Sequence, residues 1–173
     1  MKILDVGCGK NKTDGAIGID FSSNTGVDIV HDLNTFPYPF SNDVFDKVIV
    51  KNVIEHLNDI VKVMEEIHRI SKNGAEVIIT TPHFSSLYSW EDPTHKYHLA
   101  LDSFDYFTEN TKHTNFYSNK RFEVLEKKID FGKSLLSIIS RFIFLLSKHK
   151  YEKHFAFLFP ANQLYFRLKV LKK

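Results

Sequence analysis

Short apolar runs separated by turn residues dominate the first third of the chain. Residues 3–6, 16–20 and 27–30 have the length and spacing of three buried parallel strands. The links between them, residues 7–15 and 21–26, are shorter than the dozen or more residues that usually join parallel neighbours through a helix. We therefore expect a sheet that lacks its early crossover helices.

The pattern then changes to a longer strand and a helix. Residues 44–51 predict a buried strand, and residues 57–70 carry apolar side chains at helical spacing, with Asn58 or Asp59 as the cap. A second strand is expected at 76–80. A right-handed crossover between these two strands predicts a doubly wound sheet.

The rest of the chain predicts a loop, two more strands and an apolar segment. We expect a long loop over 83–100, a short helix over 102–108, and antiparallel terminal strands over 122–131 and 163–171. Residues 135–146 are mostly apolar but too few to span a bilayer. This segment is expected to cover the sheet where the early helices are missing, or to form a homodimer interface. Attachment to a membrane surface is the less favoured alternative.

Composition narrows the class of protein. A chain of 173 residues with 43% hydrophobic and 25% charged residues is typical of one soluble globular domain. The single cysteine, Cys8, excludes an intramolecular disulfide. Asp5 and the glycines after it interrupt the apolar run at the start, so we expect no signal peptide and a cytoplasmic protein.

The net charge of +2 hides an uneven distribution. Residues 110–173 contain 14 Lys and Arg against 4 Asp and Glu, and the remaining residues contain 9 against 17. A basic segment of this kind is suited to a membrane surface, a nucleic acid or a phosphorylated substrate. The alternative, at about even odds, is a solvated surface that complements the acidic half.

A glycine turn after the first strand and a carboxylate after the second give the main chemical signal. Gly7 and Gly9 allow a sharp turn and close approach of a ligand, and Asp20 is positioned to accept hydrogen bonds from both hydroxyls of a ribose. A dinucleotide site would also need a helix directly after the turn to bind pyrophosphate, and residues 10–15 leave no room for one. The pattern therefore predicts a nucleoside without a phosphate chain, for which S-adenosylmethionine is the common candidate.

Four short motifs occur in order along the first half of the chain. They are Ile3-Leu4-Asp5-Val6-Gly7-Cys8-Gly9, Ile17-Gly18-Ile19-Asp20, His31-Asp32-Leu33 and Asn52-Val53-Ile54-Glu55-His56-Leu57. Together they resemble the motifs of class I S-adenosylmethionine-dependent methyltransferases, particularly the small type 11 group. The chain departs from that pattern at Asn11, which stands at the family's third glycine position, and in the missing helix.

The resemblance implies an α/β fold with a Rossmann-like, mostly parallel sheet, antiparallel terminal strands and few helices in the N-terminal half. It implies a single domain over 1–173, with a cofactor-binding half at 1–82 and an acceptor half at 83–173 that holds the terminal strands and the apolar helix.

The resemblance also implies which residues bind the cofactor. Backbone groups of Gly7 and Gly9 would meet its amino acid end, Asp5 would lie near the ammonium group, and Asp20 would bind the ribose. The other positions are Phe21 against the adenine face, Asp32 and Leu33 at the adenine edge, and Asn52 beside the methionine portion. For Asp32 and Asn52, a turn or cap role is the alternative.

Methyl transfer mainly requires alignment of the reactants, but a hydroxyl or amine acceptor must also lose a proton, and histidine suits that work near neutral pH. The candidate catalytic residues on the expected ligand side are His56, His83, His95 and His98. The last three could instead bind a metal together with Asp92, or have a structural role. Because their spacing in the loop is not diagnostic, we predict acid–base work and no metal.

We therefore predict an S-adenosylmethionine-dependent methyltransferase for a small-molecule, sugar or lipid-linked acceptor, with the aromatic loop from His83 to Tyr97 shaping the acceptor pocket. Two alternatives stay open. One is a nucleic-acid methyltransferase that uses the basic C-terminal part, and the other is a partner-binding protein that keeps the fold without turnover. The sequence does not specify the acceptor molecule or its reacting atom.

Overall fold

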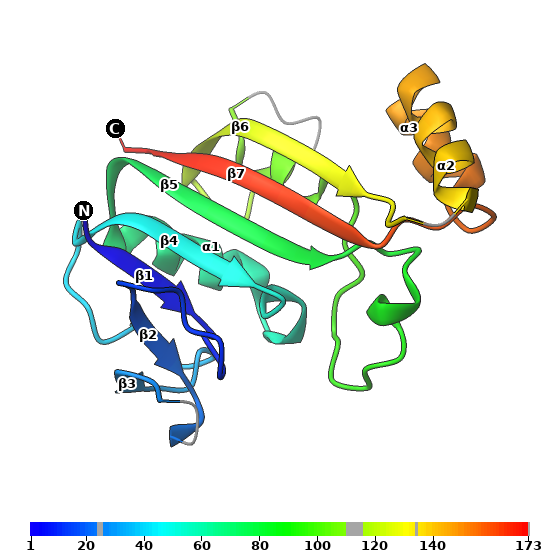
Figure 1. Cartoon of the computed structure of the whole chain (residues 1–173). Helices are drawn as coiled ribbons and strands as arrows, with labels where there is room; N and C mark the ends of the chain where they lie inside the picture. The colour runs from blue at the N-terminus through cyan, green and yellow to red at the C-terminus, as the bar shows by residue number, and fades with distance from the viewer. Residues whose placement is uncertain (24–25, 110–115, 134, 173) are drawn as a thin grey trace.

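Seven strands form one mixed sheet in the order β3-β2-β1-β4-β5-β7-β6 (Figure 1). The computed structural model describes residues 1–23, 26–109, 116–133 and 135–172. Strands β1 to β5 run parallel to their neighbours, whereas β7 is antiparallel to both β5 and β6. The strands are β1 (Ile3–Val6), β2 (Ile17–Asp20), β3 (Ile29–Val30), β4 (Phe45–Lys51), β5 (Ser71–Pro82), β6 (Arg121–Asp130) and β7 (Gln163–Leu171).

This architecture confirms the predicted α/β fold, the mostly parallel sheet and the antiparallel terminal strands. The links from β1 to β2 contain no helix, as the short spacing predicts. Two strand lengths differ from the prediction. The strand expected at 27–30 is reduced to Ile29–Val30, and the strand expected at 76–80 begins earlier, at Ser71.

Helix α1 (Ile60–Ile70) is the crossover between β4 and β5. Asp59 caps it by accepting a hydrogen bond from the Lys62 N–H at 3.0 Å, which confirms one of the two predicted caps. The helix begins three residues later than expected, because a 3-10 turn (Ile54–His56) comes first. Its buried face contributes apolar side chains to the main core, and this packing supplies most of the stability of so short a helix.

Helices cover only one face of the sheet among the described residues. On β5 and β7 buried side chains alternate with exposed or half-buried ones, because successive residues of a strand point to opposite faces. The buried face packs against α1 and the 3-10 helix Ser103–Phe107, which confirms the short helix expected at 102–108. The predicted doubly wound arrangement is therefore wrong.

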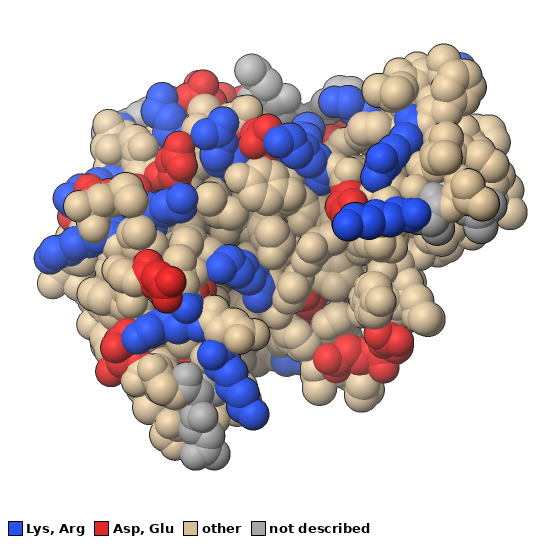
Figure 2. Space-filling model, viewed as in Figure 1, with Lys and Arg blue, Asp and Glu red and all other residues tan. Residues whose placement is uncertain are grey.

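The other face of the sheet is polar. Arg167 forms ion pairs with Glu76 and Glu126, and Lys169 pairs with Glu123. Figure 1 shows α1 behind the sheet, and Figure 2 shows basic and acidic side chains beside one another on the side facing the viewer. A face that carries paired charges needs no second layer of helices, because water solvates it.

The irregular loop expected at 35–43 folds against α1. The buried Glu66 carboxylate accepts a hydrogen bond from the Tyr38 N–H at 2.6 Å and from the Arg69 Nε at 2.9 Å. Arg69 also donates to the carbonyl groups of Tyr38 and Phe40. This network fixes the loop without regular secondary structure and adds the Tyr38 ring to the core.

The apolar C-terminal segment is helical, as predicted. Helix α2 (Leu135–Leu146) is followed by α3 (Lys148–Lys150) and a π-turn (Tyr151–Phe155), which pack together around Phe131 and Tyr151. Figure 1 shows this unit beyond the end of β6, whereas β1 to β3 lie at the opposite edge of the sheet. The expected cover for β1 to β3 is therefore wrong. No helix in the described part of the chain is long and apolar enough to cross a membrane.

Candidate active site

The parallel strands bring the predicted motifs to one edge of the sheet. Gly7 follows β1, Asp20 ends β2, Asn52 follows β4 and His83 follows β5, and these four strands run in the same direction. Ligands of open parallel sheets bind at this carboxyl edge. The glycine turn and the histidine-rich loop are thus adjacent parts of one region.

Gly7 and Gly9 have different roles in the turn after β1. Both have a positive φ, +65° and +51°. A Cβ at Gly7 would lie 2.0 Å from Val53 Cγ2, so this glycine is required by packing within the chain. A Cβ at Gly9 would have no atom within 4 Å. Of the two, only Gly9 therefore faces open space that a ligand could occupy.

Asp20 and Asp5 hold the loop between β1 and β2. Asp20 is 6% exposed, and its two carboxylate oxygens accept hydrogen bonds from the N–H groups of Gly9 at 2.9 Å and Ser22 at 3.0 Å. Asp5 accepts a hydrogen bond from the Thr13 N–H at 2.7 Å. Since each carboxylate oxygen can accept two hydrogen bonds, both oxygens of Asp20 keep capacity for a ribose hydroxyl.

Asp32 and Leu33 lie in a turn after β3. Asp32 Oδ1 accepts hydrogen bonds from the Asn34 N–H at 2.9 Å and its side-chain amide at 3.1 Å. These bonds, the backbone one first, hold the pKa of Asp32 below its usual value. The Leu33 carbonyl accepts a hydrogen bond from the Tyr38 hydroxyl at 3.0 Å. The turn role considered for Asp32 is thus present, and its carboxylate remains charged and exposed.

Phe21 and Asn52 flank the site on opposite sides. The Phe21 side chain is 77% exposed directly after Asp20, so its ring is accessible to an adenine. Asn52 has a φ of +49°, which turns the chain away from β4, and its side-chain oxygen accepts a hydrogen bond from Gln163 Nε2 at 2.7 Å. Asn52 therefore connects the cofactor edge to the start of β7.

The structure separates the four candidate histidines. His83 is fully buried, with Nδ1 2.8 Å from Ser85 Oγ and Nε2 3.2 Å from Glu152 Oε1. His98 is exposed and stacks on Trp90 with ring centroids 3.6 Å apart. The other two, His56 and His95, lie together with ring centroids 4.5 Å apart.

Glu55 joins His56 and His95. Its carboxylate is buried, with Oε1 4.0 Å from His95 Nε2, and Asp92 Oδ2 lies 4.0 Å from the same nitrogen. Burial raises the pKa of Glu55 and lowers the pKa of His56, because a low dielectric disfavours the charged forms. Hydrogen bonds from Thr94 lower the pKa of Asp92.

These residues line a hollow of about 450 Å³ at the carboxyl edge. This volume lies within the range of small-molecule sites, roughly 300–1,000 Å³. Asn52 lines it on the cofactor side, and the predicted aromatic loop contributes several more residues. The lining residues are Asn52, Glu55, His56, Pro82, Tyr88, Glu91, Asp92, His95, Asn162 and Gln163.

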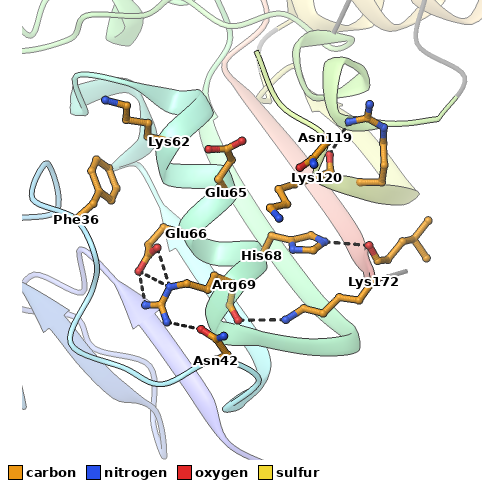
Figure 3. A pocket seen from close by; sticks show the side chains of 12 residues that line it. Phe36, Asn42, Lys62, Glu65, Glu66, His68, Arg69, Asn119, Lys120 and Lys172 are labelled. Carbon is orange, nitrogen blue, oxygen red and sulfur yellow. Dashed lines mark hydrogen bonds and ion pairs between the residues drawn. The ribbon is translucent and has the colours of Figure 1, made fainter. Parts of the chain in front are cut away.

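A larger hollow, of about 920 Å³, lies beside α1 (Figure 3). Its central polar side chains are partnered: Glu66 with Arg69, His68 Nε2 with the Leu171 carbonyl at 2.9 Å, and Lys172 with the Arg69 carbonyl at 3.1 Å. None of the predicted cofactor or catalytic residues lines it. The smaller hollow is therefore the better candidate for the acceptor site.

Comparison with known proteins places this geometry in a family. The family model described as a methyltransferase domain matches residues 1–133. The chain belongs to the S-adenosylmethionine-dependent methyltransferases. A search of curated proteins found no match.

Solved methyltransferase structures share the fold of this methyltransferase. An S-adenosylmethionine-dependent methyltransferase from Archaeoglobus fulgidus aligns with a TM-score of 0.61 at 18% identity, over 97% of this chain and 85% of its own. The YcgJ protein of Bacillus subtilis aligns with a TM-score of 0.63 at 15% identity, over 99% and 92%. A Haemonchus contortus phosphoethanolamine N-methyltransferase, solved with S-adenosylhomocysteine, aligns with a TM-score of 0.60 at 16% identity, over 100% and 50%.

The residues of this methyltransferase fit its cofactor, S-adenosylmethionine. Gly9 leaves open space next to its N–H, and Asp20 keeps acceptor capacity at the same point. Phe21 adds an accessible aromatic face. The site residue that the sequence analysis missed is Glu55. Its signal was present, since this carboxylate directly precedes His56 inside a recognised motif.

Proposed function

We propose that this methyltransferase transfers a methyl group to a small-molecule, sugar or lipid-linked acceptor bound in the 450 Å³ hollow. The observation that carries the proposal is the shared wall. Asn52 belongs to the predicted cofactor set and also lines the hollow that contains His56 and His95. An acceptor in this hollow would therefore lie next to the methionine portion of the cofactor.

We infer that Gly9, Asp20 and Phe21 bind the nucleoside and that Asp32 contributes at the adenine edge, as the family resemblance implies. S-adenosylmethionine supplies an electrophilic methyl group. The chain's own contribution is to align an acceptor atom with it and to exclude water, and alignment alone can lower a barrier by about 7–11 kcal/mol.

We assign activation of the acceptor to the group formed by Glu55, His56 and His95. This group is the concentration of titratable side chains in the hollow. His83 and His98 do not line it. We therefore no longer propose these two as catalytic residues: His83 pairs with Glu152, and His98 stacks on Trp90.

Calorimetry and a methyl-transfer assay test the proposal. S-adenosylmethionine and S-adenosylhomocysteine should both bind, and labelled methyl should appear on an acceptor from a pool of sugars, lipid-linked sugars and small hydroxyl or amine compounds. Glu55→Gln should lower kcat without changing cofactor affinity. Lys62→Ala, in the hollow beside α1, is the control and should change neither. Absence of binding of both nucleosides at millimolar concentration would refute an enzymatic role.

The alternatives make different predictions in the same experiments. A nucleic-acid methyltransferase would bind RNA in a salt-sensitive way. Several basic side chains of β6 and β7 are already paired with Glu123, Glu126 and Glu76, which does not favour this alternative. A partner-binding protein without turnover would bind cofactor but methylate nothing. A cytoplasmic location stays a prediction.

A further inference from the structure

A buried carboxylate without a partner stands out in the acceptor hollow. Glu55 is 1% exposed, and neither of its carboxylate oxygens has a hydrogen-bond partner among the described residues. The buried hydroxyl of Thr81 is also unpartnered. Even if this hydroxyl turned to donate to one Glu55 oxygen, the other would remain unsatisfied. A buried polar group in this state indicates that a ligand is to be expected.

The neighbouring hydrogen bonds fix the histidines in one tautomer. His95 Nδ1 lies 3.1 Å from the Ser89 carbonyl, which can only accept, so Nδ1 carries the proton. Thr94 donates its hydroxyl hydrogen to Asp92 Oδ1 at 2.6 Å, so its oxygen accepts from His56 Nδ1 at 2.8 Å. In the neutral imidazoles Nε2 is then the nitrogen with the lone pair. Metal-ligating histidines usually donate their second N–H in this way.

We propose that Glu55, His56 and His95 bind a divalent transition-metal cation, with Asp92 available as a fourth ligand. One ligand atom from each of the three lies within 4.8 Å of the others. Ligand bonds of about 2.0–2.2 Å imply that bound atoms lie roughly 3.3 Å apart in a tetrahedral site, so the side chains must close by about 1–1.5 Å. Two imidazoles and a carboxylate suit zinc, manganese or iron(II).

The cation would activate an oxygen acceptor, a step that rests on the proposed function. A hydroxyl bound to the metal loses its proton more readily, and the proton passes to water or to the exposed Asp92 carboxylate. The oxygen then forms a bond to the methyl carbon while the bond from that carbon to sulfur breaks. The electron pair goes to sulfur and leaves a neutral thioether. The substrate class implied is a hydroxylated compound with an oxygen positioned to bind the metal.

Metal binding is measured on the whole protein, independently of activity. After treatment with a chelator, calorimetry with Zn²⁺ should give one site per chain, and Co²⁺ should give a visible absorption band typical of histidine ligation. Glu55→Gln and His95→Asn should each weaken binding at least about 10-fold, since loss of even an outer partner typically costs 10–100-fold. His98→Asn, which alters a histidine outside the hollow, should leave the affinity unchanged.

Three outcomes would overturn the metal site: no binding by the wild-type protein, unchanged affinity in both variants, or binding of a protonated amine to metal-free protein that Glu55→Gln abolishes. The wild-type Co²⁺ spectrum tests the proposal even if a variant fails to fold. Binding of S-adenosylmethionine is measured in parallel. Loss of metal binding with intact cofactor binding would refute this inference alone, whereas the reverse would refute the proposed function.

A separate observation concerns helix α2, whose polarity is inverted. Ser137 and Ser140 are 4% and 1% exposed, whereas Ile138, Phe142 and Leu145 are 62%, 62% and 81% exposed. A surface helix normally buries its apolar stripe. The exposed apolar face continues onto the end of the unit. Its members are Leu135, Ile138, Ile139, Phe142, Leu145, Leu146, Phe157 and Leu158, and we call them the apolar face of α2.

The charges around this face have one sign. Between residues 133 and 158 the chain has five basic side chains, Lys133, Arg141, Lys148, Lys150 and Lys153, all exposed, and the acidic residue is Glu152. Glu152 points inward, where its Oε1 accepts a hydrogen bond from the Leu101 N–H at 2.7 Å. Figure 2 shows the tan surface of this unit with basic side chains next to it. A second copy would bring like charges together, whereas an anionic surface would attract them.

We infer that the apolar face of α2 binds the surface of an anionic lipid bilayer. Exposed apolar side chains flanked by Lys and Arg are the features of a helix that lies in the membrane interface. The protein should co-sediment with vesicles of phosphatidylglycerol and phosphatidylcholine, less with phosphatidylcholine alone, and less again at high salt. Phe142→Asp and Lys148→Glu should each reduce binding, whereas Leu125→Asp on β6 should not.

Equal binding to neutral and anionic vesicles would overturn this inference. So would a dimer in sedimentation analysis that Phe142→Asp dissociates, combined with no vesicle binding by the wild-type protein. Because α2 contributes no residue to the acceptor hollow, cofactor affinity should be the same in all three variants, and this measurement also reports whether they fold.

Discussion

The two glycines of the first turn should respond in opposite ways to the same substitution. Gly7→Ala is expected to destabilise the protein strongly, whereas Gly9→Ala should mainly weaken cofactor binding. The reason is that an added Cβ lies 2.0 Å from Val53 Cγ2 at Gly7 but meets no atom within 4 Å at Gly9. The comparison separates a packing requirement from a ligand-approach requirement.

The magnitudes follow from two contributions. A non-glycine residue with left-handed backbone costs roughly 1–2 kcal/mol, and this applies at both positions because φ is +65° at Gly7 and +51° at Gly9. Overpacking adds about 1–3 kcal/mol at Gly7 alone. We expect the free energy of unfolding to fall by about 2–5 kcal/mol for Gly7→Ala and by about 1–2 kcal/mol for Gly9→Ala.

Urea denaturation measures the free energy of unfolding, and calorimetry measures the affinity for S-adenosylmethionine. The decisive control is Val53→Ala, which removes the methyl groups that an alanine at position 7 would strike. In the Val53→Ala background, Gly7→Ala should cost about 1–3 kcal/mol less than in the wild type. Equal costs in the two backgrounds, or equal destabilisation by the two glycine substitutions, would refute the steric argument.

Three further predictions test other parts of the structure. Asp20→Asn should weaken S-adenosylmethionine binding by roughly 10–100-fold, which corresponds to loss of a hydrogen bond to a charged group, as measured by calorimetry. Glu66→Ala removes the acceptor of the Tyr38 N–H and should lower the free energy of unfolding by about 2–3 kcal/mol in urea titrations; an unchanged midpoint would contradict a role in fixing the loop. Burial lowers the pKa of His68 from 6.5 despite its bond to the Leu171 carbonyl, so the unfolded chain binds the proton more tightly. Stability should therefore be unaffected above about pH 6.5 and fall as the pH drops below it, and His68→Leu should flatten this pH dependence of the melting temperature.

Strands and the crossover helix could be predicted because their signals are local. The alternation of apolar residues indicates β4 and β5, and the helical spacing over 57–70 indicates α1. The position of α2 could not, because an apolar segment does not specify which surface it packs against. The polar face of the sheet did have a signal. Glu76, Arg167 and Lys169 alternate with buried residues on β5 and β7, which shows that this face did not need the cover that was expected.

The candidate site was predictable in its position but not in its grouping. The carboxyl edge of a parallel sheet follows from strand order, so all four histidines were placed on the ligand side. Which of them meet depends on the path of the loop after β5. The Ser89 carbonyl bonds to His95, and Glu152, from a segment far along the chain, bonds to His83. Such tertiary bonds leave no trace in local spacing.

A set of carboxylate bonds explains how the cofactor edge is maintained without the helix that normally follows the first strand. Asp20 accepts from the Gly9 N–H, Asp5 from the Thr13 N–H, and Asp28 from the Gly18 N–H at 2.7 Å. Each bond anchors a backbone group of the loop to the end of a strand, which is the work a crossover helix would otherwise do by packing.

This arrangement gives Asp20 two roles, because the same carboxylate that fixes Gly9 also faces the expected ribose. In Asp20→Asn, one of two N–H donors, from Gly9 or Ser22, would meet an amide group that cannot accept a hydrogen bond. The unfolding free energy should then fall by about 1–2 kcal/mol together with the loss of affinity. In a methyltransferase that keeps the helix, the turn would be fixed by packing, and the same substitution should reduce affinity with little change in stability.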